Sequence, residues 1–340
     1  MTHVCPVAGA ALLAVAVGLG SPSAAPLQAQ GGEVVVYSSR SHYGSEPVFE
    51  AFTKKTGTKV TFLMGNNNEV FERLRSEGAR TKADMLLTVD AGNLWNAARE
   101  GLLAPVTSTA LEANIPAHLR DPENRWFGLA VRARTIMYST ARVKPSELST
   151  YEALGDPKWK GRLCLRTSSN LYNQSLLASL IKQYGEPATE KMVRGWIANA
   201  PTYINGDTQI LEAIAAGRCD VGITNTYYLA RLVSKDPSFA VAPFWPDQNA
   251  GGVHVNVSGA GITAHATNKA QALALLEYLS TPEAQAILAG ASFEYPAHPG
   301  VPAHDLLKKW GTFKSQTAGV AAAGEFQAAA VKLADRAGYR

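Results

Sequence analysis

The sequence predicts an α/β protein with two lobes that are joined by β-strands and separated by a cleft. With 340 residues, the chain is long enough for two lobes of ordinary domain size. Residues 33–63 have the order strand, polar loop, helix, strand, which is typical of a parallel sheet. Residues 126–138 form a long β-prone run without a turn signal. One strand of that length could pass from one lobe to the other.

The individual elements follow from apolar periodicity and from the residues that start and stop them. The first helix begins at Pro47, places Val48, Phe49 and Phe52 on one side, and stops at Gly57. The predicted strands are 33–37, 59–63, 83–89, 126–138, 162–166, 219–224 and 255–262, and we interpret the last as the return crossing between the lobes. Further helices are predicted over 69–77, 94–100, 174–184, 189–198, 208–216, 229–233, 268–279, 282–290 and most of 303–337.

The first thirty residues have the character of a cleaved secretory signal. They contain no Lys, Arg, Asp or Glu, and residues 7–19 form an apolar run that is too short to span a bilayer. Small residues follow, so we expect cleavage between Ala25 and Gln30. A membrane anchor is the alternative. Residues 1–30 are therefore assigned to a signal peptide and the mature protein is expected to be exported.

Cleavage would remove Cys5 and leave two cysteines, Cys164 and Cys219, each in or beside a predicted strand. In an oxidising compartment an even pair favours one disulfide bond. The alternative is two buried free thiols. Two cysteines this far apart do not have the spacing of a zinc finger.

Composition and motifs exclude several classes of function. The net charge is +4 with 18% charged residues, and no basic block is interleaved with aromatic residues, so nucleic acid is not an expected partner. The chain has no Gly-x-Ser-x-Gly elbow, no His-Glu-x-x-His and no phosphate loop. Ser38, Ser39 and His42 lie close in sequence, but spacing places no acidic partner beside them. We therefore do not expect an enzyme.

Tyrosines recur where predicted strands end and helices begin. Tyr227 and Tyr228 follow the strand 219–224, Tyr172 follows the strand 162–166, and Tyr43 with its neighbour His42 follows the first strand. Ligands of open α/β sheets bind at this edge. If the chain crosses at 126–138, Tyr43 belongs to one lobe and the other three to the second, so a cleft between the lobes would bring the four phenols and the imidazole together.

Such a set of ligands fits ferric iron. Oxygen donors suit hard cations, whereas zinc or copper would require more His or Cys, and calcium would require Asp and Glu. A phenol has a pKa near 10, but a bound cation can displace its proton, so that binding releases protons and weakens as the pH falls. Helix N-termini at these junctions could also help to hold an anion.

Several motifs resemble one known family. They are Tyr-Ser-Ser-Arg-Ser-His-Tyr at 37–43, Ala-Asp-Met-Leu-Leu-Thr-Val-Asp at 83–90, Trp-Lys-Gly at 159–161, Ser-Ser-Asn-Leu-Tyr-Asn-Gln-Ser-Leu at 168–176, Asn-Thr-Tyr-Tyr-Leu-Ala-Arg at 225–231 and Glu-Tyr-Pro at 294–296. Together they resemble the periplasmic ferric-iron-binding proteins of ABC transporters, over nearly the whole mature chain. The resemblance implies a type II periplasmic-binding-protein fold, in which two α/β lobes joined by a β-strand hinge close on iron.

The resemblance also implies roles for individual residues. Tyr43, Tyr172, Tyr227 and Tyr228 match phenolate ligands, and His42 matches a position that ligates in some members only. Around them, Arg40 or Arg132 could neutralise phenolates or hold a synergistic anion such as carbonate, or simply be solvated at the surface. We leave Glu69 out, Asn93 lies where an arginine is expected, and Tyr138, Tyr203 and Tyr295 are assigned to packing.

The resulting expectation is a monomeric periplasmic receptor that binds Fe³⁺ between two lobes and delivers it to an inner-membrane ABC permease. The first lobe is expected to contain residues 33–130 and 259–300, and the second 131–258 and 301–340. The alternative is the same fold binding an organic solute or an oxyanion without a metal. Sequence leaves open whether the cargo is the free ion or a chelate, and whether Fe²⁺ also binds.

Overall fold

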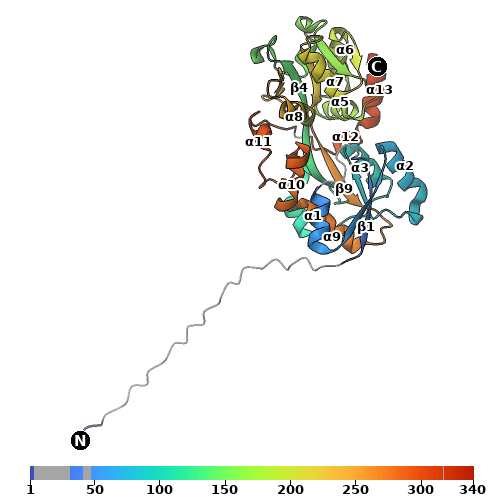
Figure 1. The fold of residues 1–340 in the computed structure, drawn as a ribbon, viewed down its shortest axis with the longest axis vertical. Helices are drawn as coiled ribbons and strands as arrows, with labels where there is room; N and C mark the ends of the chain where they lie inside the picture. The colour runs from blue at the N-terminus through green and yellow to red at the C-terminus, as the bar shows by residue number, and fades with distance from the viewer. Residues whose placement is uncertain (4–30, 41–46, 317) are drawn as a thin grey trace.

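The protein has a two-lobed α/β fold (Figure 1). The computed structural model describes residues 1–3, 31–40, 47–316 and 318–340. One large hydrophobic core fills the lower lobe of Figure 1, and two smaller clusters of buried side chains fill the upper lobe. Residues 4–30 of the predicted signal peptide lie outside the described residues. Within the described part of the chain, we find no helix with the length and apolar character needed to cross a membrane.

The strands form one sheet that runs through both lobes, in the order β2-β1-β3-β9-β4-β7-β5-β6, with β8 and β10 paired to β4. The strands are β1 (Glu33–Ser38), β2 (Lys59–Met64), β3 (Met85–Thr88), β4 (Phe127–Ser139), β5 (Leu163–Arg166), β6 (Tyr203–Ile204), β7 (Val221–Asn225), β8 (Val241–Phe244), β9 (Val255–Ile262) and β10 (Tyr295–Pro296). The pairs β1–β2, β1–β3, β5–β6 and β5–β7 are parallel, as the order of strand and helix predicts.

Helices cover the sheet in each lobe. They are α1 (Pro47–Thr56), α2 (Asn67–Glu77), α3 (Ala91–Arg99), α4 (Thr109–Asn114), α5 (Leu171–Tyr184), α6 (Glu186–Asn199), α7 (Asp207–Ala215), α8 (Thr226–Lys235), α9 (Lys269–Ser280), α10 (Pro282–Ser292), α11 (Asp305–Lys308), α12 (Ala322–Glu325) and α13 (Gln327–Ala337). In α1 the predicted apolar face is buried: Val48, Phe49 and Phe52 pack into the first core. Each of these side chains contributes about 1.5–3 kcal/mol through burial.

The strand that joins the lobes is β4, which confirms the predicted crossing. From Phe127 to Ala133 it pairs with β9, and from Arg134 to Ser139 it pairs with β7 and β8. The return crossing was expected within the strand 255–262, but β9 pairs from end to end with β3 and β4 of the first lobe. Val253 already packs in the first core, so the chain returns just before β9 begins.

Several helices begin earlier than predicted, and two of them, α5 and α8, carry candidate ligands. The helix α5 begins at Leu171 instead of residue 174, and α8 begins at Thr226 instead of residue 229. Asn170 ends the loop before α5, since its side chain accepts a hydrogen bond from the Tyr172 N–H at 3.0 Å. Tyr172, Tyr227 and Tyr228 therefore lie in the first turns of helices rather than in loops. The positive end of the helix dipole favours negative charge there.

The C-terminal segment is less helical than predicted. Of residues 303–337, α11, α12 and α13 are helical, but residues 309–316 and 318–321 are not. Gly311 and Gly319 have φ angles of +76° and +70°, a conformation that interrupts a right-handed helix. The helix α4 was not predicted; Ser108 caps it by accepting a hydrogen bond from the Leu111 N–H. The strand β8 was also missed.

Cys164 and Cys219 form a disulfide bond, as predicted. The bond links the second residue of β5 to the segment just before β7, and both cysteine side chains are buried in the same cluster. It closes a loop with a sequence separation of 55 residues.

Removing this bond is expected to destabilise the second lobe. Replacing both cysteines by serine should lower the free energy of unfolding by about 2–5 kcal/mol, because the unfolded chain regains the entropy that the closed loop had removed. Urea denaturation of the variant and of the wild-type protein measures the difference. Wild-type protein unfolded with a reducing agent is the control and should show a similar loss. Equal stability with and without the bond would contradict the prediction.

Candidate metal centre

Two neighbouring strands position the described tyrosines. The strand β5 precedes α5 and its Tyr172, and β7 runs directly into α8 with Tyr227 and Tyr228. Because β5 and β7 are parallel, with Cys164 opposite Gly222, their carboxyl ends lie at the same edge of the sheet. The sequence therefore brings phenols that are more than fifty residues apart to one place.

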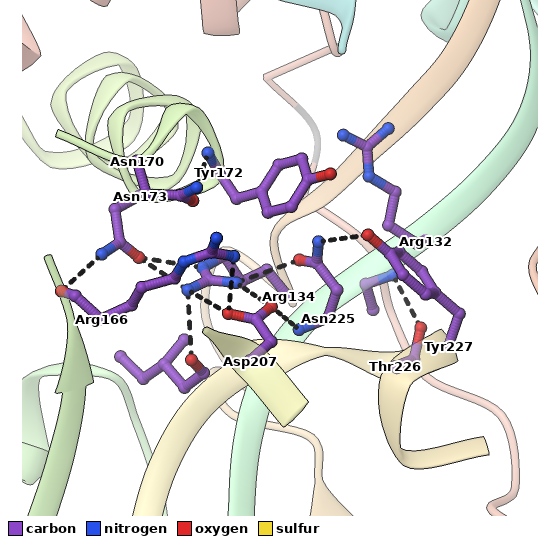
Figure 2. Close-up of polar contacts among 12 residues, drawn as sticks. Arg132, Arg134, Arg166, Asn170, Tyr172, Asn173, Asp207, Asn225, Thr226 and Tyr227 are labelled. Atoms are coloured by element: carbon purple, nitrogen blue, oxygen red, sulfur yellow. Dashed lines mark hydrogen bonds and ion pairs between the residues drawn. The ribbon is translucent and has the colours of Figure 1, made fainter. Parts of the chain in front are cut away.

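The three phenols interact with one another. The rings of Tyr227 and Tyr228 lie 4.3 Å apart between centroids, at an interplanar angle of 36°. Tyr227 and Tyr172 are buried, and Tyr228 is half-buried. Burial raises the pKa of the Tyr172 phenol to about 12, and the neighbouring Tyr228 adds to this rise, whereas Arg132 and a hydrogen bond with Tyr227 act in the opposite direction. Figure 2 shows the hydroxyls of Tyr172 and Tyr227 on the side that faces Arg132.

Guanidinium groups surround these rings. Arg132 and Arg166 lie 5.5 and 5.6 Å from the centroid of the Tyr172 ring, and Arg231 lies 5.1 Å from that of Tyr227. Arg132 is only 2% exposed, and its Nη1 has no hydrogen-bond partner among the described residues. Positive charge at these positions stabilises the phenolate form of the tyrosines, which is the form that ligates metals.

A buried carboxylate holds Arg132 in place and contacts both lobes. Asp90, at the end of β3, pairs with Arg132 at 3.4 Å and accepts hydrogen bonds from Asn256 of β9 at 2.8 Å and Ser175 of α5 at 2.9 Å. It also caps α3 through the Gly92 N–H at 2.8 Å. Burial raises the pKa of the Asp90 carboxyl, and the Arg132 charge and these hydrogen bonds oppose that rise. Asp90 thus ties the helix that carries Tyr172 to the first lobe.

A second buried ion pair lies beneath the tyrosines (Figure 2). Arg134 pairs with Asp207 at 2.8 Å and donates to Asn173 at 2.7 Å and to Asn225 at 3.3 Å. Asn173 directly follows Tyr172, and Asn225 precedes Tyr227 by two residues and donates to its hydroxyl at 3.4 Å. The ion pair therefore fixes the starts of both tyrosine-bearing helices.

Three buried residues beneath the tyrosines were not predicted from the sequence: Arg134, Asp207 and Asn173. A signal was present, because Arg132 and Arg134 are two residues apart in an otherwise apolar strand and so lie on the same face. Charged side chains are rarely buried unless they are paired, and such a pattern indicates a buried ion-pair network.

Other candidate residues lie as follows. His42 and Tyr43 fall outside the residues that the structure describes. Arg40 is buried and pairs with Glu294 at 3.2 Å. Glu69 belongs to the capping box of α2, where it accepts from the Asn66 N–H at 2.8 Å. Tyr295 packs edge-on against Phe313 in a half-buried position, at 5.5 Å between ring centroids.

Within the described residues, no three side chains of His, Cys, Asp or Glu are grouped so that they could hold a metal. Three phenolic oxygens near three guanidinium groups can bind a hard cation of high charge, since the ligands carry negative charge once deprotonated.

Similar proteins are known. The chain is 44% identical to "Iron uptake protein A1" of Synechocystis sp., over 91% of this chain and 88% of that protein. Two solved structures are similar to the fold of this chain. One is described as "Trichodesmium (IdiA) (FutA) in complex with iron and citrate ligands", with a TM-score of 0.87 and 46% identity over 91% of this chain and all of that one. The other is the "Ferric binding protein from Campylobacter jejuni", with a TM-score of 0.84 and 34% identity over 90% of this chain and all of that one.

These structures confirm the predicted two-lobe fold. A family description also covers most of the chain: residues 48–315 match "Bacterial extracellular solute-binding protein". With this match and the similarity to the Synechocystis protein, the chain belongs to the family of bacterial extracellular solute-binding proteins.

Proposed function

We propose that this protein is the periplasmic receptor of an iron ABC transporter and binds Fe³⁺ through tyrosine phenolates between its lobes. The observation that carries the proposal is the meeting of Tyr172, Tyr227 and Tyr228 at one edge of the sheet. The names of the similar proteins, which include "Iron uptake protein A1" and "Fe(3+)-binding periplasmic protein", support the same cargo. The receptor catalyses no reaction; it captures the ion and delivers it to a membrane permease.

The ligand set that we propose is Tyr43, Tyr172, Tyr227 and Tyr228, with His42 as a further ligand. The charge balance supports phenolate ligation, because three or four phenolates offset the charge of Fe³⁺ and the nearby guanidinium groups stabilise the excess negative charge. Arg132 is the residue best suited to hold a synergistic anion such as carbonate, since its Nη1 has no partner among the described residues.

Capture requires the two lobes to move. We propose that the two expected lobes, residues 33–130 with 259–300 and residues 131–258 with 301–340, close as rigid bodies about β4, with the boundary of the returning chain moved to just before β9 because Val253 packs in the first core. The change of partners along β4, from β9 to β7 and β8, supports a hinge near Ala133 and Arg134. Closure would bring the loop after β1, with His42 and Tyr43, against the three tyrosines of the second lobe.

The working form of the receptor is a monomer in the periplasm, exported by a signal peptide that is cleaved between Ala25 and Gln30. The small residues before Gln30 support that cleavage range. An oxidising compartment is also where the Cys164–Cys219 bond can persist. Size-exclusion chromatography with light scattering and N-terminal sequencing of the exported protein test these two points.

A visible absorption spectrum tests the cargo. The mature protein is freed of iron with a chelator and then titrated with ferric citrate. Charge transfer from tyrosinate to Fe³⁺ gives a broad visible band, which an organic solute or an oxyanion cannot produce. A colourless protein that does not retain iron would contradict the proposal and favour the same fold binding a solute without a metal.

Iron binding is expected to weaken as the pH falls. The pKa of the Tyr172 phenol is raised to about 12, so the ligand is protonated at neutral pH before iron binds. Each phenol must lose its proton to the solvent, and each proton released makes the affinity fall about tenfold per pH unit. Calorimetric titration in two buffers of different ionisation enthalpy counts the protons. If no protons were released, the phenols would keep their protons when iron binds, and phenolate ligation would be excluded.

A further inference from the structure

A pocket lies beside β8 and the end of β4 that pairs with it, where Tyr138 and Phe244 are among its lining residues. It has a volume of about 580 Å³, within the range of small-molecule sites. Four aromatic residues line it: Tyr138, Phe244, Trp245 and Trp310. Trp245 packs against the core of the first lobe, whereas Tyr138, Phe244 and Trp310 pack against the two clusters of the second. Tyr172, Tyr227 and Tyr228 do not line this pocket, so it is distinct from the tyrosine site.

One acidic residue, Asp247, lines this pocket. Asp247 is 6% exposed and also lines an adjoining pocket of about 260 Å³. Its backbone N–H donates to the Ser149 carbonyl at 3.1 Å, and its own carbonyl accepts from Ala250 at 2.9 Å and Gly252 at 3.0 Å. Its φ angle of +57° is uncommon for a residue other than glycine. The surrounding loop therefore holds Asp247 in one conformation.

The carboxylate of Asp247 has hydrogen bonds but no countercharge. It accepts from the Tyr151 N–H at 3.3 Å and interacts with the Tyr184 hydroxyl. Among the described residues, no Lys, Arg or His forms an ion pair with it. Lys191, in the adjoining pocket, pairs with Glu152 at 3.8 Å, and Lys314 donates to the Ala250 carbonyl at 2.7 Å. Burial raises the pKa of the Asp247 carboxyl, so the anion is costly in this position.

We propose that this pocket binds a small organic ammonium ion, with its alkyl groups against the aromatic rings and its charge next to Asp247. The faces of Trp, Tyr and Phe rings attract cations that shed their water easily, and a quaternary ammonium is such a cation. A buried carboxylate without a cationic partner gains most from a ligand of this kind, because buried charges are stable when they are paired. A bare metal ion fits less well, since Asp247 is the single carboxylate in the lining of this pocket.

Because Trp245 packs against the core of the first lobe and the other three rings pack against the clusters of the second, the ammonium ion would contact side chains that both cores hold in place. This site goes beyond the proposed iron receptor and does not depend on it. A protein that bound no iron could still bind an ammonium ion here, and the reverse is also true.

Choline is the probe for this site. Isothermal titration of the iron-free mature protein with choline is expected to give saturable binding of one equivalent. The neutral isostere 3,3-dimethylbutan-1-ol, which has the same shape without the charge, is expected to bind at least about tenfold more weakly, a difference of about 1.4 kcal/mol. Asp247→Asn should weaken choline binding by a similar factor, and asparagine tolerates the positive φ angle of this position.

Control variants distinguish the loss of the Asp247 charge from a general loss of folding. Asp236→Asn removes a surface carboxylate that accepts hydrogen bonds from the N–H and the hydroxyl of Ser238, and it should leave choline binding unchanged. Circular dichroism and urea denaturation verify that Asp247→Asn is folded. If that variant does not fold, Tyr138→Leu removes one ring of the pocket without altering the carboxylate and should also weaken choline binding. The proposal is overturned if choline does not bind, if the neutral alcohol binds equally well, or if a folded Asp247→Asn or Tyr138→Leu variant binds choline as the wild-type protein does.

Discussion

Replacing both Tyr227 and Tyr228 by phenylalanine is expected to abolish the visible ferric band and to weaken iron binding by more than about 100-fold. Even the loss of an outer-sphere partner of a metal ligand costs 10–100-fold in affinity, and this variant removes two of the proposed ligands. The rings remain, so their packing at 4.3 Å is retained. Iron-free protein should therefore stay folded, with a loss of at most about 1.5 kcal/mol for each missing hydroxyl. Competition with a ferric chelator and urea denaturation measure the two quantities.

A matched control removes two hydroxyls elsewhere. Tyr203 lies in β6 and its ring packs on Tyr339, and Tyr278 lies in α9 with a hydroxyl that has no partner among the described residues. The variant Tyr203→Phe/Tyr278→Phe should keep the ferric band and the affinity. If the Tyr227/Tyr228 variant kept its affinity as well, the tyrosine pair would not be part of the iron site.

Much of the fold follows from local sequence signals. The parallel β1–β2 and β1–β3 pairs, the apolar face of α1 and the long strand β4 are confirmed, because each depends on a periodic pattern or on a strong start and stop residue. The short strand β8 was not predicted because its four residues, Val241–Phe244, include a proline. It pairs with the C-terminal part of β4, Ile136–Ser139. Proline in a strand is tolerated at an edge, and sequence alone does not identify that edge.

The site was predicted in part. The recurrence of tyrosine after two predicted strands was enough to predict that Tyr172 lies near Tyr227 and Tyr228. The carboxyl ends of parallel strands meet at one edge of the sheet, so residues that follow them lie close together. The buried pairs Arg132–Asp90 and Arg134–Asp207 join residues that are 42 and 73 positions apart, and no local pattern indicates such partners. The proposed roles of His42 and Tyr43 depend on a resemblance and stay predictions.

Replacing Arg134 by methionine is expected to cause the largest loss of stability among single substitutions around the site, about 3–5 kcal/mol. Methionine keeps an unbranched side chain but leaves the buried Asp207 carboxylate with Arg166, at 3.2 Å, as its remaining cation. Removing one partner of a buried ion pair leaves the other charge less well compensated, which costs more than the pair itself contributes. Iron binding should weaken as well, because Asn173 and Asn225 lose the donor that fixes the two tyrosine-bearing helices.

A control and a double variant test the contribution of this ion pair. Arg75→Met breaks an exposed pair with Glu72 on α2 and should cost less than about 1 kcal/mol. Asp207→Asn, added to Arg134→Met, removes the uncompensated charge, so the double variant should lose less stability than the sum of the two single losses. Urea denaturation of the wild-type protein, Arg134→Met, Asp207→Asn and the double variant completes this double-mutant cycle. If the two losses were simply additive, or if Arg134→Met cost no more than Arg75→Met, the ion pair would not be what holds the two helix ends. Their arrangement would then depend on the packing of α5 and α8 alone.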